Sequence, residues 1–177
     1  IFYDISVHDM AALRHIFGPI DELMAYGQKK DVVLGQLAVV NVVFRFMSGF
    51  TGSYNFYCAG KEPQRPLVGL RIIGRRGEIY QEERDSGVIN VIYTDGTSKG
   101  ISYTPQRGYY NELVNFYNAY LGKEQISVSP EIELGDAKTV LAVLESIEQE
   151  TPVKVDEETF TPSYDFGAKI TYEDKRM

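Results

Sequence analysis

Residues 35–59, GQLAVVNVVFRFMSGFTGSYNFYCA, decide the fold class of this chain. They contain two runs rich in Val, Phe and Tyr that are separated by a glycine-containing turn, a pattern typical of successive strands. The second run, 52–58, carries apolar or aromatic side chains on both faces, more than a sheet with one solvated face needs. We therefore expect one face of the sheet to meet helices and the other to meet a partner. The alternative for any single tyrosine here is simple strand propensity.

The same texture extends over residues 20–103, where glycine turns separate short runs of Val, Ile, Phe and Tyr. Two of these turns, 74–77 and 95–96, look like hairpin connections, so successive strands are expected to pair antiparallel. The predicted strands are 21–26, 35–47, 52–59, 66–74, 78–82, 88–94 and 98–103.

Three helices are predicted beside these strands. The first spans 7–17, with Ser6 as its N-cap and Gly18 as its stop. The third spans 134–149. The second ends at Gly122 and carries an apolar stripe formed by Tyr109, Leu113, Phe116, Tyr117, Tyr120 and Leu121.

This order of elements predicts an α+β domain over residues 1–155. We expect a large, mostly antiparallel or mixed β-sheet with helices packed on one face. The other face is expected to serve oligomerisation, as a homodimer or homotetramer. Residues 156–177 are expected to form an extension that wraps the surface or pairs with a sheet edge. Because residue 1 is not a methionine, we expect the chain to be part of a longer protein.

Composition excludes several classes of function. The chain has 177 residues and a formal net charge of -7, which repels a polyanion, so no nucleic acid partner is expected. The longest apolar stretch, 37–47, is far shorter than the ~20 residues of a membrane helix, so no membrane partner is expected. The single cysteine, Cys58, permits no internal disulfide and lies inside a strand pattern, where we interpret it as a core residue. A reducing cytoplasm fits this usage.

The two histidines, His8 and His15, both lie in the first 15 residues. They are two helical turns apart, about 10 Å along the axis, which is too far to share a metal. Asp4 precedes His8 by four residues, on the approach to the predicted helix. An acid beside a histidine is what a general base with an orienting carboxylate requires. The open alternative is a capping Asp and a partly buried structural His.

Other motifs carry less chemistry. A metal site built from Asp4, His8 and Asp9 is not expected, because these groups lack a ligand from a distant segment. No dinucleotide-binding glycine motif is present, since Gly69, Gly74 and Gly77 have hairpin spacing. A basic cluster is interpreted as a solvated hairpin face, with Arg65 kept as a candidate contact to a substrate hydroxyl or carboxylate. Its members are Lys61, Arg65, Arg71, Arg75 and Arg76.

Residues 3–18, YDISVHDMAALRHIFG, resemble the start of the C-terminal domain of the Gfo/Idh/MocA oxidoreductases, in which an Asp-x-Gly-x-His-x-x-Asp-like segment opens a helix that ends in Gly. Three later segments resemble the family in the same order: the 72–79 hairpin, the helix around 110–116, and the closing helix of 134–153. The resemblance covers about residues 1–155. Ser6 stands where the family usually has Gly, which alters the approach of the backbone to a ligand.

The resemblance implies a catalytic pair, Asp4 and His8, that also contacts substrate. His8 would accept the proton of a sugar or polyol hydroxyl while hydride leaves the same carbon for a nicotinamide ring. The family's dinucleotide-binding (Rossmann) domain is not in this sequence. We therefore expect NAD or NADP to serve the full-length protein, and this chain alone to bind neither and to be inactive. The alternative is a non-catalytic sugar-binding, regulatory or oligomerisation module of the same fold.

Overall fold

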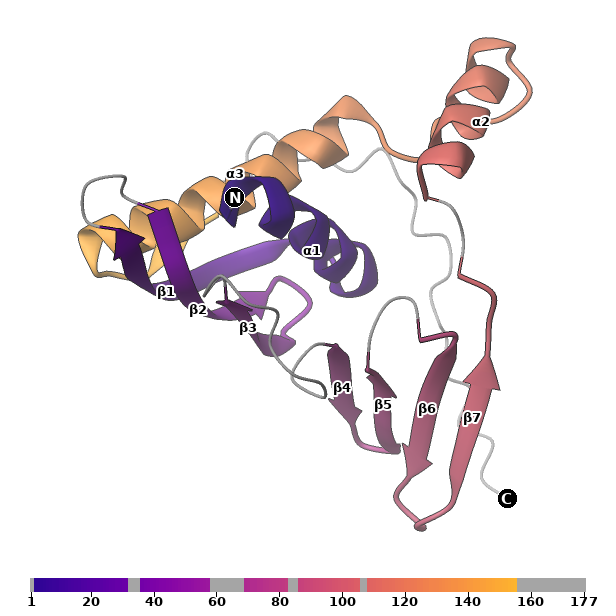
Figure 1. The fold of residues 1–177 in the computed structure, drawn as a ribbon, viewed down its shortest axis with the longest axis horizontal. Coiled ribbons are helices and arrows are strands. Elements are labelled where there is room, and N and C mark those ends of the chain that lie inside the picture. The colour runs from indigo at the N-terminus through magenta and orange to yellow at the C-terminus, as the bar shows by residue number, and fades with distance from the viewer. Residues whose placement is uncertain (1, 32–35, 58–68, 83–85, 106–107, 156–177) are drawn as a thin grey trace. The chain divides into compact units, whose positions relative to one another are not determined.

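The computed structural model describes residues 2–31, 36–57, 69–82, 86–105 and 108–155. The chain divides into two compact units, Ile1–Cys58 together with Val128–Met177 (unit 1) and Ala59–Ser127 (unit 2). Arg65, Cys58 and the predicted extension 156–177 lie outside the described residues. The elements are α1 (Phe2–Phe17), β1 (Ile20–Asp31), β2 (Gln36–Phe46), β3 (Thr51–Tyr57), β4 (Leu70–Gly74), β5 (Gly77–Gln81), β6 (Val88–Tyr93), β7 (Ser98–Ser102), α2 (Gly108–Tyr120), α3 (Pro130–Gln149) and β8 (Val153–Lys154) (Figure 1).

The described elements confirm the α+β class, but the strands form two four-stranded sheets rather than the one large sheet expected. Sheet A lies in unit 1 and has the order β3-β2-β1-β8, and sheet B lies in unit 2 with the order β4-β5-β6-β7. Every pairing in both sheets is antiparallel. The hairpins predicted at 74–77 and 95–96 are confirmed, since they join β4 to β5 and β6 to β7.

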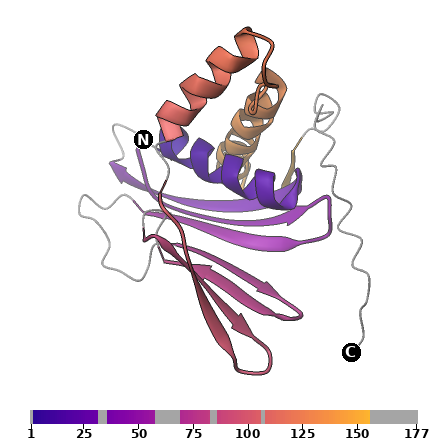
Figure 2. The same ribbon diagram turned by 90° about the vertical axis from the view of Figure 1, so that its right-hand side faces the viewer.

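Unit 1 is a two-layer structure in which α1 and α3 cover the same face of sheet A (Figure 2). Alternate residues of β2, from Val40 to Phe46, are buried beneath the helices, as the period of two in a strand requires, and Leu23 and Ala25 of β1 and Phe56 of β3 join them in the core. Phe2 of α1 packs edge-on against Phe56 of β3, with ring centroids 5.2 Å apart. The core consists of Phe2, Met10, Ile20, Leu23, Ala25, Val40, Val42, Phe44, Phe46, Phe56, Val140, Ala142, Val143, Val153 and Val155.

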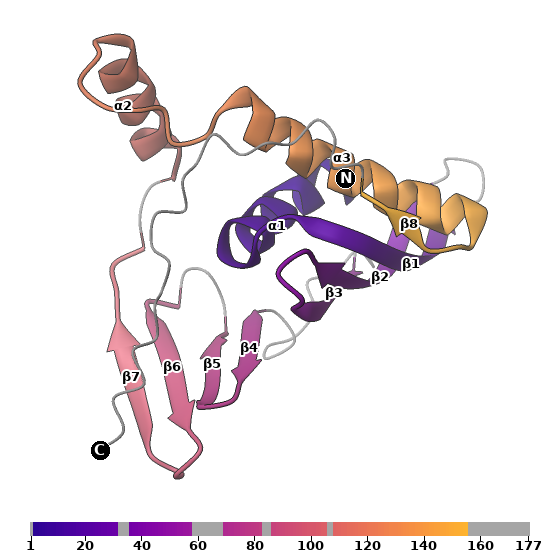
Figure 3. The ribbon, with the colours of Figure 1, turned by 180° about the vertical axis from the view of Figure 1, so that it is seen from behind.

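Sheet A gains its fourth strand from the far end of the described chain. β8 follows α3 directly and pairs with β1 through Glu22 with Lys154 and Leu23 with Val153, as Figure 3 shows from behind. The sequence pattern does not predict this short strand. Its two residues are too few to show a period of two. Residues 156–177, which were expected to wrap the surface or pair with a sheet edge, lie outside the described residues.

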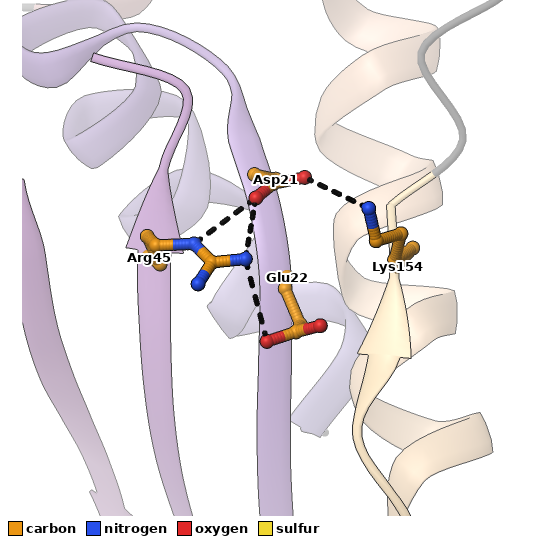
Figure 4. A network of polar contacts seen from close by, with 4 residues as sticks. All are labelled: Asp21, Glu22, Arg45 and Lys154. Atoms are coloured by element: carbon orange, nitrogen blue, oxygen red, sulfur yellow. Dashed lines mark hydrogen bonds and ion pairs between the residues drawn. The ribbon is translucent and has the colours of Figure 1, made fainter. Parts of the chain in front are cut away.

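The face of sheet A opposite the helices carries a network of four charged side chains (Figure 4). Arg45 of β2 donates two hydrogen bonds to Asp21 of β1, and its guanidinium also lies 3.6 Å from Glu22. Lys154 of β8 lies 3.8 Å from Asp21 on the other side. The network ties three neighbouring strands together, although such exposed pairs contribute little to stability.

In the described part of unit 2, no residue is buried. One face of sheet B, the apolar face, gathers aliphatic side chains across all four strands, while the opposite face carries the exposed ion pair Arg71–Glu78. This pair supports the solvated-hairpin interpretation for the described members of the basic cluster. The apolar members of this face are Leu70, Ile72, Ile79, Ile89, Val91, Tyr93 and Ile101, and Gln81 and Lys99 share the face with them.

Helix α2 confirms the predicted second helix, but its apolar stripe is exposed rather than packed. The loop that follows α2 folds back against the polar side of the helix. Asn115 donates to Glu124 and to the carbonyl of Gln125, and Asn118 donates to the second oxygen of Glu124. The backbone NH of Ser127 donates to the side-chain oxygen of Asn115. Within unit 1, the expectation that helices cover one face of a sheet is confirmed for α1 and α3.

The other two helices begin earlier than predicted. α3 begins at Pro130, after the N-cap residue Ser129, where the expected start was 134. The fixed φ of proline suits the first turn, and the apolar pattern alone does not reach that far. α1 begins at Phe2 rather than after Ser6, because burial of Phe2 extends the packed stripe by a full turn.

Candidate functional site

The predicted pair, Asp4 and His8, lies one turn apart on α1. The earlier start of the helix places Asp4 inside its first turn, which corrects the expectation that Asp4 lies on an approaching strand or loop. At a spacing of four residues the two Cβ atoms are roughly 6 Å apart, close enough for the side chains to act on one ligand. Both side chains are exposed.

The packed side of α1 decides where this pair points. Phe2, Ser6, Met10 and Arg14 are spaced by four and are buried against the rest of unit 1. At about 100° per residue, Asp4 and His8 lie on the opposite side of the helix. His15 is exposed on that same side, as its spacing of seven from His8 predicts. The catalytic candidates therefore face away from sheet A.

A polar cluster fastens the flank of α1 to β3. The hydroxyl of Tyr54 donates to Oδ2 of Asp9 at 2.7 Å, and it lies 3.3 Å from Oγ of Ser6. Burial raises the pKa of Tyr54, and the Asp9 carboxylate raises it further, while the bond to Ser6 lowers it. The phenol is therefore protonated at neutral pH and serves as a hydrogen-bond donor to Asp9.

A buried ion pair joins α1 to α3. Arg14 donates to Oδ1 of Asp136 and to the carbonyl of Ile132, the latter at 3.2 Å. Burial raises the pKa of Asp136, and the Arg14 guanidinium opposes that rise. Both side chains are nearly buried, at 7% and 4% exposed, so each charge depends strongly on the other. The pair anchors the C-terminal half of the site helix.

The sequence predicted Asp4 and His8 but missed the groups that hold their helix. Tyr54 and Asp9 belong to segments 45 residues apart, so no local pattern links them. Arg14 did carry a signal: it follows Met10 by four on the apolar stripe, and a charge on a buried stripe requires a buried partner. Arg65 lies outside the described residues. Within the described ranges, no group of three or more His, Cys, Asp and Glu side chains is arranged to hold a metal ion.

Chemically, the exposed side of α1 offers an imidazole and a carboxylate to a ligand. An imidazole is a proton acceptor near neutral pH, and a neighbouring carboxylate can orient it or stabilise its charged form.

No helix in the described part of the chain is long and apolar enough to cross a membrane.

The model for the C-terminal alpha/beta domain of the Gfo/Idh/MocA oxidoreductase family matches residues 1–155. The chain belongs to this family. The match confirms the family suggested by the resemblance of residues 3–18. Among curated proteins, no sequence matches this chain.

Solved structures show the same fold. An oxidoreductase from Agrobacterium radiobacter, solved with NAD+, L-tartaric acid and magnesium, superposes with a TM-score of 0.71 at 19% identity, over 88% of this chain and 49% of that one. The aldose-aldose oxidoreductase of Caulobacter crescentus, solved with glycerol, gives a TM-score of 0.71 at 17% identity, over 86% and 47%.

The WlbA dehydrogenase of Bordetella pertussis, solved with NADH and UDP-GlcNAcA, gives a TM-score of 0.65 at 14% identity, over 85% of this chain and 43% of that one. This chain thus spans about half the length of each of these three oxidoreductases.

Proposed function

We propose that this chain is the substrate-binding half of an NAD(P)-dependent dehydrogenase that oxidises a CH–OH group of a sugar, sugar nucleotide or polyol. The observation that carries the proposal is the placement of Asp4 and His8 one turn apart on the exposed side of α1, in a chain of this oxidoreductase family. Relatives solved with NAD+ or NADH, and with a sugar nucleotide or glycerol, support the substrate class.

Oxidation of an alcohol removes a proton from oxygen and a hydride from carbon. In the proposed reaction His8 accepts the hydroxyl proton, and Asp4 holds the hydroxyl or the imidazolium that forms. The described residues do not fit a dinucleotide, because that site needs a parallel βαβ unit with a glycine-rich turn, and all strand pairs here are antiparallel. The hydride acceptor, NAD or NADP, is therefore assigned to a different part of the full-length protein, and this chain alone is expected to be inactive.

The test replaces His8 in a protein that joins this chain to its dinucleotide-binding domain. His8→Ala is expected to lower kcat by about 10²- to 10⁴-fold, the usual contribution of a positioned general base. His15→Ala is the matched control, since it removes an imidazole from the same exposed side of the same helix, and its turnover is expected to stay near wild type. Unchanged turnover in His8→Ala would refute the assignment.

We further propose that the protein is a homodimer or homotetramer assembled through its sheets. The apolar face of sheet B supports this, since three of its seven apolar side chains are exposed and the other four are only partly buried in the single chain. The same face favours the alternative of an assembly or sugar-binding module without chemistry. Two results together would favour that alternative: light scattering shows an oligomer, and the His8→Ala variant keeps full function. The cytoplasmic location stays a prediction.

A further inference from the structure

The hydroxyl of Tyr54 is bonded to two residues of the site helix. It lies on β3, half-buried beneath α1, and reaches Asp9 at 2.7 Å and Ser6 at 3.3 Å. A phenol has one proton to give. Since that proton goes to the Asp9 carboxylate, Ser6 donates its own proton to the tyrosine oxygen. The result is a directed chain from Ser6 through Tyr54 to Asp9.

Ser6 and Asp9 are three residues apart, so they sit about 60° from each other around the helix axis. A single hydroxyl bound to both resists rotation of α1 in either direction. The apolar contacts of Phe2 and Met10 hold the helix against the sheet, but such contacts are non-directional and specify rotation less sharply.

Rotation of α1 matters because His8 directly precedes Asp9, and Asp4 lies one turn before His8. A turn of the helix about its axis swings both exposed side chains sideways across the ligand. Misplacement of a reacting group by about 1 Å costs on the order of 100-fold in rate. A hydrogen bond that fixes the rotation of α1 therefore affects the reaction rate even though it makes no contact with the substrate.

We infer that Tyr54 is a positioning residue, which joins Ser6 and Asp9 of α1 to strand β3 and thereby sets the direction of Asp4 and His8. The inference rests on the proposed function for its kinetic consequence, but its structural consequence can be measured separately.

The first test uses the 177-residue chain, whose only histidines are His8 and His15, so that each imidazole gives an assignable NMR signal. Tyr54→Phe is expected to shift the Cε1–H signal of His8 and to leave that of His15 in place. Tyr57→Phe is the matched control, because it removes an exposed hydroxyl from the opposite face of the same strand, and it is expected to shift neither signal. An unmoved His8 signal in folded Tyr54→Phe overturns the inference.

Two variants of Asp9 keep the inference testable if Tyr54→Phe does not fold. Asp9→Ala and Asp9→Asn both remove the charge next to His8, but only asparagine keeps an oxygen that accepts the Tyr54 proton. The His8 signal is expected to differ between them, with asparagine giving the better ordered helix. Identical His8 signals in the two variants would count against the positioning role.

The second test is kinetic, in the protein that carries both halves. Tyr54→Phe and Asp9→Ala are each expected to lower kcat by about tenfold, with KM nearly unchanged, and the double variant is expected to be no slower than either. Asp9→Asn is expected to restore most of the loss. Full kcat in Tyr54→Phe, beside an inactive His8→Ala, overturns the inference and leaves the proposed function standing. Full turnover in His8→Ala defeats the proposed function, and the NMR signals then decide the positioning role.

Discussion

The two compact units differ in how their sheets are covered. In unit 1, two helices close one face of sheet A and fifteen apolar residues are buried beneath them. In the described part of unit 2, sheet B and α2 expose apolar side chains and bury none. Burial of apolar surface is the main stabilising contribution to folding, so unit 1 holds the core that can stand by itself. Unit 2 lacks such a core in its described part, and the assembly proposed above would supply a cover for its apolar side chains.

The largest expected effect comes from the buried ion pair of unit 1. Arg14→Met leaves the carboxylate of Asp136 buried without its partner, and we expect the free energy of unfolding at pH 7 to fall by about 3–5 kcal/mol. Urea denaturation measures it. The double variant Arg14→Met with Asp136→Leu should regain most of the loss. A loss below about 1 kcal/mol for the single variant would contradict the buried pairing.

The same variant predicts a pH dependence. Arg14 lowers the pKa of Asp136 against the effect of burial, so its removal raises the folded-state pKa further. A carboxyl whose pKa is raised on folding binds protons more strongly in the folded chain, so its penalty is full above the folded pKa and vanishes below the ordinary value of 3.8. The stability gap between Arg14→Met and the wild type is therefore expected to shrink as the pH falls from 7 toward 4.

The next effect compares one apolar truncation in each unit. Met10→Ala removes a side chain that is 0% exposed in unit 1 and is expected to cost about 2–5 kcal/mol. Ile73→Ala removes one that is 74% exposed in unit 2 and is expected to change stability by no more than about 0.5 kcal/mol. Equal losses in denaturant titrations would mean that the two units do not differ as described.

The variant with the smallest expected effect on the free energy of unfolding tests whether a second copy of the chain covers sheet B. Ile79→Lys places a charge on the apolar face of sheet B, where the side chain is 42% exposed in the single chain. We expect little change in stability but a lower molecular mass by light scattering across a concentration series, because the charge blocks assembly. Ile73→Lys is the matched control on the opposite face of the same sheet. An unchanged mass in Ile79→Lys excludes this face as the interface.

Much of the fold could be predicted from the sequence, because local patterns carried it. The strand texture, the glycine hairpins at 74–77 and 95–96, and the helical stripes are short-range signals. The division into two sheets could not be predicted, since strand texture says nothing about where pairing stops. The start of α1 was missed because Ser6 looks like a cap, whereas its side chain bonds to a strand 48 residues away.

The candidate pair was predictable because Asp4 and His8 are neighbours in sequence as well as in space. The supports of the pair were not, because Tyr54 and Asp136 approach α1 from distant segments. The spacing and the family resemblance suggested the pair, and the fold adds the groups that hold its helix; the catalytic role of the pair stays a prediction. The role of Arg65 stays a prediction.

The position of β8 in sheet A has a consequence for biosynthesis. The strand that completes the sheet, and the helix that buries Arg14, come from the last part of the described chain, and Arg14 and Asp136 are 122 residues apart. At about 5–20 residues per second, translation needs roughly 6–24 seconds to deliver the second partner. During that interval the nascent α1 and the first three strands wait with their apolar side uncovered by α3. We expect this segment to be the one that a ribosome-associated chaperone engages.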